Sequence, residues 1–417
     1  MKESALRQQG RGVAAEQLRR HNLSTILDRL HLSGPMSRSE LAQQTGLNRS
    51  TVADLIGELA TLALVEEGPG AANTGPGRPS PVAKVRPEGA TVLALELSVD
   101  SIAVATVGLG GHIYNQIRVA RPRGRFTPEE TVEDISKLAE PLLGALPGAH
   151  QLVGVGVAVA GVVRRTDGFV HLAPNLGWRN VPLGTIVEKR LSLGQAVSMA
   201  NEADLGSLAE YRRGAGSGVQ HLLYLAGEAG IGAGIIQEGR PMLGAAGYAG
   251  EVGHTRVNPE GRQCRCGGKG CWETEAGEAA LARRAGVSDL IGQRLVEELI
   301  LRATTGDSRT LEALTVTGRW LGLGIGNLIN IFNPDRVVVG GSYHDLYPYL
   351  EESMIRSVQE VALSAPGESA EIVPGVLGVD APLVGAAELA LSSVITNPAA
   401  ATGVHPGFAV DFVDDGG

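Results

Sequence analysis

The chain has 417 residues, enough for two or three domains, and its hydrophobic content of 43% is usual for a soluble globular protein. Its longest apolar run, residues 152–163, is too short for a membrane span of roughly 20 residues, and the first residues lack the apolar core of a signal peptide. Three cysteines cannot build a disulfide framework, which excludes a disulfide-rich secreted protein. Because the apolar run is also too short for a membrane span, we expect a cytoplasmic protein with no membrane partner.

The formal net charge of −9 is unevenly distributed along the chain. Residues 1–90 hold 11 Lys and Arg against 9 Asp and Glu, whereas the remaining residues hold 25 against 36. A slightly basic N-terminal region on an acidic body is compatible with a nucleic-acid-binding head, although so small an asymmetry is weak evidence alone.

Residues 21–88 are predicted to form a winged helix-turn-helix domain, after a loose segment over residues 1–20. The alternative is that residues 14–23 extend its first helix. Apolar residues at helical spacing predict a first helix that a Gly-Pro pair ends, a short second helix over residues 38–44 and a third that begins after Asn48. A strand, a Gly/Pro-rich tip and a return strand follow, and together they predict the wing.

Local signals at the ends of these helices support the prediction. Ser37 and Glu40 have the spacing of a capping box, and Gly46 can take the positive φ of the turn. In such domains the helix after the turn enters the major groove by its N-terminal end. The residues expected to contact double-stranded DNA are Arg38, Asn48, Arg49, Ser50, Thr51 and, from the wing, Arg78. The alternative is a small helical oligomerisation module with a flexible linker.

From Thr91 onward, predicted strands alternate with predicted helices. An apolar strand over residues 152–159 follows a helix that begins at Pro128, and further helices are predicted over residues 277–304 and 308–330. This alternation predicts an α/β body. The acidic, Ala/Gly/Pro-rich residues 397–417 are predicted to be disordered.

All three cysteines fall within eight residues, and a histidine precedes them. Cys264, Cys266 and Cys271 offer three thiolates and His254 an imidazole, which is a complete tetrahedral ligand set for structural Zn2+. Two alternatives remain open at this point. A Cys266–Cys271 disulfide fits a cytoplasmic protein poorly and leaves one thiol over, and the cysteines could also be free and buried.

Five motifs occur in an order that carries a family resemblance. They are "APNLGW" (173–178), "NEAD" (201–204), "GYAGEVGH" (247–254), "CRCGGKGCWE" (264–273) and "VVVGGS" (337–342). In these motifs the chain resembles the ROK family of repressors and sugar kinases. The resemblance implies an actin-like body of two α/β lobes around a cleft, the first lobe formed by residues 91–201 and 380–396 and the second by residues 202–379. A winged N-terminal head implies the repressor branch of the family.

The resemblance also implies the residues of the sugar and zinc sites. The family binds zinc with the four positions of the Cys/His cluster. The implied sugar contacts are Gly161, Asn175, Asn201, Glu202, Glu251, His254 and Glu273. Because a zinc ion would hold both segments that flank the cluster, it would orient Glu251 and Glu273 toward one ligand.

Three departures from the kinase pattern predict that phosphoryl transfer is lost. Kinases of the family begin the first lobe with Asp-x-Gly-Gly-Thr, whereas this chain has side chains at both glycine positions and an acid at Asp100. Glu202 stands at the position of the catalytic Asp and would be a vestigial base. Glu228 and Ala229 replace the Gly-Thr of the second phosphate turn.

These observations predict a sugar-responsive DNA-binding regulator, a repressor of carbohydrate-utilisation genes that acts as a homodimer or homotetramer. Sugar bound between the lobes would change operator affinity. Two alternatives are a ROK-type ATP-dependent sugar kinase with a DNA-binding head, and a regulator that responds to a protein or to a sugar phosphate.

Overall fold

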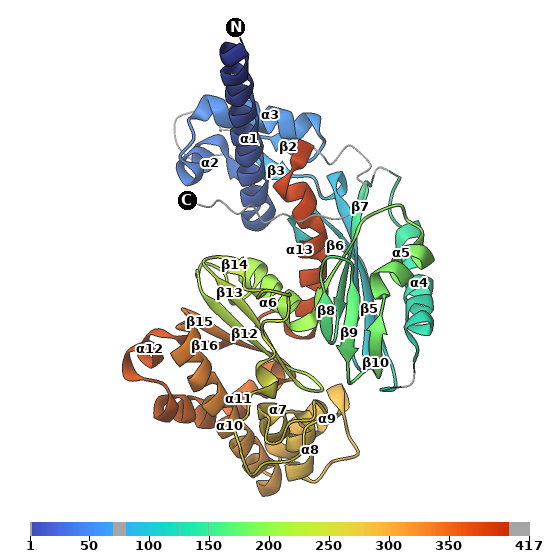
Figure 1. Ribbon diagram of the computed structural model, residues 1–417, viewed down its shortest axis with the longest axis vertical. Helices are drawn as coiled ribbons and strands as arrows, with labels where there is room; N and C mark the ends of the chain where they lie inside the picture. Colours follow the sequence, from blue (N-terminus) through green and yellow to red (C-terminus); the bar gives the residue numbers. More distant parts are fainter. Residues whose placement is uncertain (1, 70–80, 125, 149, 400–417) are drawn as a thin grey trace.

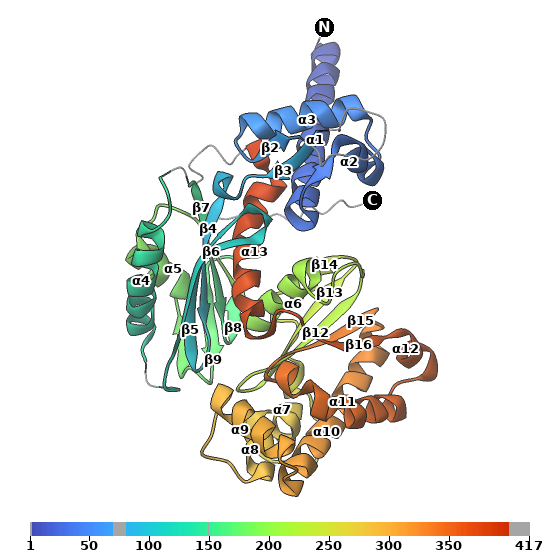
Figure 2. The ribbon, with the colours of Figure 1, turned by 180° about the vertical axis from the view of Figure 1, so that it is seen from behind.

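The structure is a computed structural model that describes residues 2–69, 81–124, 126–148 and 150–399. Figures 1 and 2 show an N-terminal head at one end, a second lobe at the other end and a first lobe between them. The two-lobed α/β body and the helical head agree with the predicted fold class. The predicted disordered segment 397–417 lies outside the described residues from residue 400 onward.

The head is built from three helices and a small sheet with strand order β1-β3-β2. Its elements are α1 (Lys2–Ser33), β1 (Met36–Ser37), α2 (Arg38–Thr45), α3 (Arg49–Thr61), β2 (Val65–Gly68) and β3 (Val82–Val85). Strands β2 and β3 pair antiparallel and form the wing. This arrangement is the predicted winged helix-turn-helix.

The predicted caps form in the head. The Ser37 hydroxyl accepts a hydrogen bond from the Glu40 amide at 3.3 Å, and the Glu40 carboxylate accepts one from the Ser37 amide at 2.7 Å. Gly46 ends α2 with φ of 71°, which is the left-handed conformation that glycine adopts without steric cost. Because capping depends only on residues a few positions apart, the sequence predicts it directly.

The prediction that residues 1–20 are loose is wrong for residues 2–20, because α1 runs through them as one helix. This stretch has no proline and consists largely of Ala, Gln, Arg, Leu and Glu, which have high helix propensity. The first helix is therefore much longer than the segment with apolar spacing.

The first lobe contains a five-stranded sheet with strand order β11-β7-β4-β5-β6. Its strands are β4 (Thr91–Leu97), β5 (Ser101–Gly108), β6 (His112–Ala120), β7 (Leu152–Val159) and β11 (Val197–Asn201). Helices α4 (Pro128–Gly144) and α5 (Leu183–Leu191) cover one face, and α13 (Ala381–Thr396) covers the other (Figure 1). A separate three-stranded sheet of β8 (Val162–Arg164), β9 (Phe169–Ala173) and β10 (Trp178–Val181) lies beside it.

The second lobe repeats the strand order of the first. Its strands are β12 (Leu222–Gly227), β13 (Ile231–Gln237), β14 (Arg240–Pro241), β15 (Arg336–Gly341) and β16 (Glu371–Pro374), in the order β14-β13-β12-β15-β16. Its helices are α7 (Trp272–Ala276), α8 (Glu278–Ala285), α9 (Gly292–Thr304), α10 (Ser308–Phe332), α11 (Ser342–Val361) and α12 (Ser364–Ser369). The predicted helix over 277–304 is thus two helices, separated at Gly286 with φ of 75°.

Helix α6 (Glu202–Arg213) lies where the two lobes meet. It packs against α13 of the first lobe and against β12 and β13 of the second lobe. Very close backbone approaches make these contacts tight, because a Cβ on Gly385 of α13 would lie 1.9 Å from the Leu205 carbonyl oxygen. Helix α6 is therefore packed tightly against elements of both lobes.

The head shares its hydrophobic core with the first lobe. Leu27 and Leu30 of α1 belong to the same buried cluster as Leu391 and Val394 of α13. Residues 378–396 are long and apolar enough to cross a membrane, but 67% of that stretch is buried inside the protein. We therefore interpret α13 as a core helix.

Candidate functional site

The three cysteines and the histidine converge in the second lobe. His254 lies on a short 3-10 helix (Val252–His254), Cys264 and Cys266 lie on the following loop, and Cys271 precedes α7. The ligand atoms of all four residues lie within 4.8 Å of one another. Sequence reasoning brought together the same four residues.

The distances within this group fit zinc and not a disulfide. The Cys266 and Cys271 sulfur atoms are 3.7 Å apart, and the Cys264 sulfur lies 3.7 Å from the His254 Nδ1. Two thiolates bound tetrahedrally to one zinc ion, each about 2.3 Å from it, are separated by about 3.8 Å, whereas a disulfide bond is about 2.05 Å long. The donor set of three sulfurs and one imidazole nitrogen suits structural Zn2+.

The metal-ligand group lies directly beside α7, which is anchored from its other side. Trp272, the first residue of α7, is fully buried, and its indole nitrogen donates to the Trp320 carbonyl at 2.7 Å. Glu273 follows, and its Oε1 lies 4.0 Å from the Cys264 sulfur. A zinc ion on one side and the indole on the other would leave the Glu273 carboxylate little freedom.

The implied sugar residues lie in two groups. In the second lobe, the Glu251 Oε2 is 3.9 Å from the His254 Nε2, and the Glu273 carboxylate lies against the Gly230 backbone. In the first lobe, Asn201 caps α6 and donates from Nδ2 to the Gly161 carbonyl at 2.8 Å. That these residues contact a sugar remains a prediction.

One contact that the sequence did not predict joins the two groups. Arg265, between two of the cysteines, donates to the Asn175 Oδ1 at 2.7 Å, and this bond crosses from the second lobe to the first. The only feature of the sequence that pointed to Arg265 was its position between two cysteines of the cluster. Asn175 is therefore paired with the loop that carries the cysteines rather than free.

Four carboxylates gather around the predicted phosphate positions. Burial, and then the neighbouring charges of Glu96 and Asp100, raise the pKa of Glu202 to about 8. Burial also raises the pKa of Glu228 well above its ordinary range, and Glu202 raises it further. In the part of the chain that the structure describes, Glu202 forms no ion pair.

The other two acids of this group are held by arginines. Arg118 contacts the Glu96 carboxylate at 2.8 Å and Asp380 at 2.9 Å. Arg123 contacts Asp100 at 2.9 Å. The carboxylates at the start of the first lobe thus have protein cations as partners, and after burial they are a second cause of the raised pKa of Glu202 and Glu228.

The predicted DNA contacts lie at the start of α3. The Asn48 Oδ1 accepts from the Thr51 amide at 2.8 Å and from the Ser50 hydroxyl at 2.7 Å, so these three residues form the cap. Arg49 is exposed. Arg38 is paired with the wing, because its Nε donates to Glu67 at 2.7 Å, and its contact with DNA remains a prediction. Arg78 lies outside the described residues.

Comparison with known proteins identifies the family. The ROK family profile matches residues 92–393, which is well over half of the chain. The chain belongs to the ROK family. This confirms the resemblance inferred from the motif order.

Relatives of this ROK protein include both repressors and kinases. It is 29% identical to the xylose repressor of Bacillus subtilis, over 89% of this chain and 94% of the relative. The structure of a ROK family transcriptional regulator, a homologue of the Escherichia coli MLC protein, shares the fold with a TM-score of 0.75 and 23% identity, covering 91% of this chain and 98% of that chain. A glucokinase from Streptomyces griseus, solved with glucose and AMPPNP, is 30% identical with a TM-score of 0.62, over 72% of this chain and 99% of the kinase.

The raised pKa of Glu202 predicts how the stability of this ROK protein depends on pH. Its folded-state pKa of about 8 lies above the ordinary value of 4.5, so the folded state holds more protons between these values and loses stability as the pH rises through them. Glu202→Gln does not titrate and escapes that loss. We expect its melting temperature to match the wild type near pH 5 and to exceed it by about 2–6 °C at pH 9.

Differential scanning calorimetry at both pH values measures this difference. Glu352→Gln is the matched control, because its carboxylate is exposed on α11. A Glu202→Gln variant with the same pH dependence as the wild type would contradict the argument.

Proposed function

We propose that this protein is a sugar-responsive transcriptional repressor of carbohydrate-utilisation genes. The observation that carries the proposal is a winged helix-turn-helix head that shares a hydrophobic core with a two-lobed ROK body. The match to the xylose repressor of Bacillus subtilis covers 89% of the chain, which is more than the body alone, whereas the match to the glucokinase covers 72% of it. A regulator of this kind acts in the cytoplasm.

The proposed DNA contacts are made by the start of α3, with Asn48, Ser50 and Thr51 forming the helix cap and Arg49 exposed beside it. A helix of this kind presents its N-terminal residues to base edges and phosphates in the major groove. A homodimer or homotetramer would place two heads on one palindromic operator, with the wing residue Arg78 reaching the backbone or minor groove.

The proposed sugar site lies between the lobes and is assembled around zinc. His254, Cys264, Cys266 and Cys271 would hold the ion, whose role is structural. The carboxylates of Glu251 and Glu273 and the amide of Asn201 suit sugar hydroxyls, because they form paired hydrogen bonds. Gly161, Asn175, Glu202 and His254 complete the proposed contacts. A sugar that prefers one lobe arrangement by about 1.4 kcal/mol changes operator affinity tenfold.

A sugar kinase is the second candidate, and the glucokinase similarity favours it. Against it stand the four acids Glu96, Asp100, Glu202 and Glu228 near the phosphate positions. Ser98 and Val99 also replace the two glycines at which the backbone of the family's kinases lies against the phosphates, so their side chains would obstruct a triphosphate. We therefore propose that the body binds sugar without phosphorylating it.

A combined binding and turnover assay tests the proposal. Purified protein is screened for thermal stabilisation by D-xylose, D-glucose, other monosaccharides and their phosphates, and each stabilising compound is added to gel shifts with an operator selected from random duplex DNA. We expect at least one free sugar to change operator affinity about tenfold or more, with no sugar-dependent release of ADP from ATP.

Two outcomes would contradict this. Sugar-dependent ADP release that disappears in Glu202→Gln would establish a kinase. Operator binding that no sugar or sugar phosphate affects would indicate a protein effector.

A further inference from the structure

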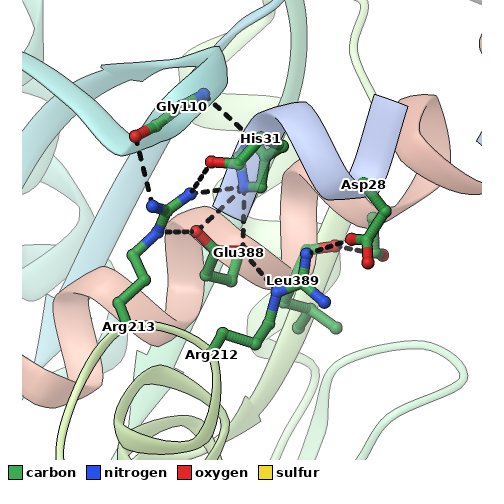
Figure 3. Close-up of polar contacts among 8 residues, drawn as sticks. Asp28, His31, Gly110, Arg212, Arg213, Glu388 and Leu389 are labelled. Atoms are coloured by element: carbon green, nitrogen blue, oxygen red, sulfur yellow. Dashed lines mark hydrogen bonds and ion pairs between the residues drawn. The ribbon is translucent and has the colours of Figure 1, made fainter. Parts of the chain in front are cut away.

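A buried group of charged residues connects the head to the body (Figure 3). Glu388 of α13 accepts hydrogen bonds from Arg212 Nε at 2.7 Å and from Arg213 Nε. Arg212 also contacts Asp28 of α1 at 2.7 Å. We call Asp28, His31, Arg212, Arg213 and Glu388 the head latch.

The histidine of the head latch is held from two sides. The Gly110 amide donates to the His31 Nδ1 at 2.9 Å, and the His31 Nε2 faces both the Glu388 carboxylate, at 3.1 Å, and the Arg213 guanidinium. The turn that contains Gly110 also accepts from Arg213 at 3.1 Å. The last turn of α1 is thereby tied to three other elements of the body.

The head latch is a buried ionic network rather than a surface one. The side chains of His31 and Glu388 are 0% and 1% exposed. Burial alone would raise the pKa of Glu388, but His31, Arg212 and Arg213 hold it well below its ordinary value. Glu388 is therefore ionised, and removing one of its three partners leaves its buried charge less well compensated.

One helix joins the head latch to the proposed sugar site. Helix α6 begins beside its cap residue Asn201, which is bonded to Gly161, and it ends with Arg212 and Arg213. Twelve helical residues span about 18 Å as a stiff rod. Helix α6 also packs against elements of both lobes, so a change in the lobe arrangement moves its two ends together.

The structure assigns to α6 and the head latch a coupling role. We propose that the latch holds α1, and with it the head, in one orientation on the first lobe, and that a change at the Asn201 end of α6 loosens or tightens that hold. This rests on the proposed function for its biological meaning. The mechanical claim concerns the chain alone and requires no identified sugar.

Hydrogen exchange of the full-length protein, followed by mass spectrometry, tests the latch first. Arg213→Gln and the nearly isosteric Glu388→Gln are expected to speed exchange in residues 22–33 about tenfold. The matched control is Arg190→Gln, which removes an ion pair with Glu133 on the far side of the first lobe. Unchanged exchange in residues 22–33 in both latch variants would overturn the proposal.

A double-mutant comparison then tests transmission through α6. Asn201→Ser keeps a residue that caps helices well but is too short to reach the Gly161 carbonyl. We expect it to change exchange in residues 22–33 when the latch is intact, and to cause no further change in the Arg213→Gln background. An equal change in both backgrounds, or none in either, would refute transmission through the latch.

Operator gel shifts with D-xylose and with D-glucose separate this inference from the proposed function. If the exchange results are as expected but no sugar alters operator binding, the proposed function fails and the latch stands. If sugars alter operator binding equally in the wild type and in Arg213→Gln, the proposed function stands and the latch proposal fails.

Discussion

Replacing Cys271 with serine is expected to remove zinc from the protein and to lower its affinity for the sugar by about a hundredfold. Cys271 is buried and immediately precedes α7, which carries Glu273. Without the metal, the loop that holds Cys264 and Cys266 has lost its anchor, and the carboxylates on both of its flanks lose their fixed relation. We expect the substitution to weaken sugar binding more than it destabilises the core of the lobe, because Trp272 remains buried.

Elemental analysis of the purified protein measures the zinc, and titration calorimetry measures binding of whichever sugar the screen identifies. Lys269→Ala is the matched control, because Lys269 lies in the same loop with an exposed side chain that is not a metal ligand. Protein that lacks metal and yet binds the sugar with unchanged affinity would show that the cysteines do not support the site.

Replacing Arg49 with alanine is expected to weaken operator binding by about 10- to 100-fold, with sugar affinity unchanged. Arg49 is exposed at the N-terminal end of α3, where a helix of this type meets the major groove. Arg49 forms no ion pair among the described residues, so its removal should change the stability of the folded head little. The proposed sugar contacts lie in the body and are not touched by this change.

Fluorescence anisotropy with the selected operator, at several salt concentrations, checks this prediction. If Arg49 contacts a phosphate, the salt dependence falls by about one ion, whereas a base contact instead relaxes the preference for one base pair. Arg29→Ala is the control, because Arg29 is exposed in the same head but on α1. A variant that loses sugar binding together with DNA binding would argue against separate head and body functions.

Most of the local structure could be read from neighbouring residues. The capping box at Ser37, the turn at Gly46 and the Cys/His group depend on residues a short distance apart, and the structure shows each of them. The extension of α1 back to Lys2 was missed, and its extension over residues 14–23 was only an alternative, because the weak apolar pattern concealed a high helix propensity. The break near Gly286 was missed for the opposite reason, since apolar spacing continues on both sides of it.

The amino-acid order alone thus determined the winged head, the α/β alternation and the four metal-ligand positions, because each depends on spacing within one segment. Only the folded chain decided that Arg265 meets Asn175 and that His31 meets Glu388, since these pairs are 90 and 357 residues apart. No feature of the sequence near Glu388 in the apolar helix α13 predicts which residues it will contact. Its partners are chosen by the packing of α1, α6 and α13, which brings opposite charges together where water is excluded.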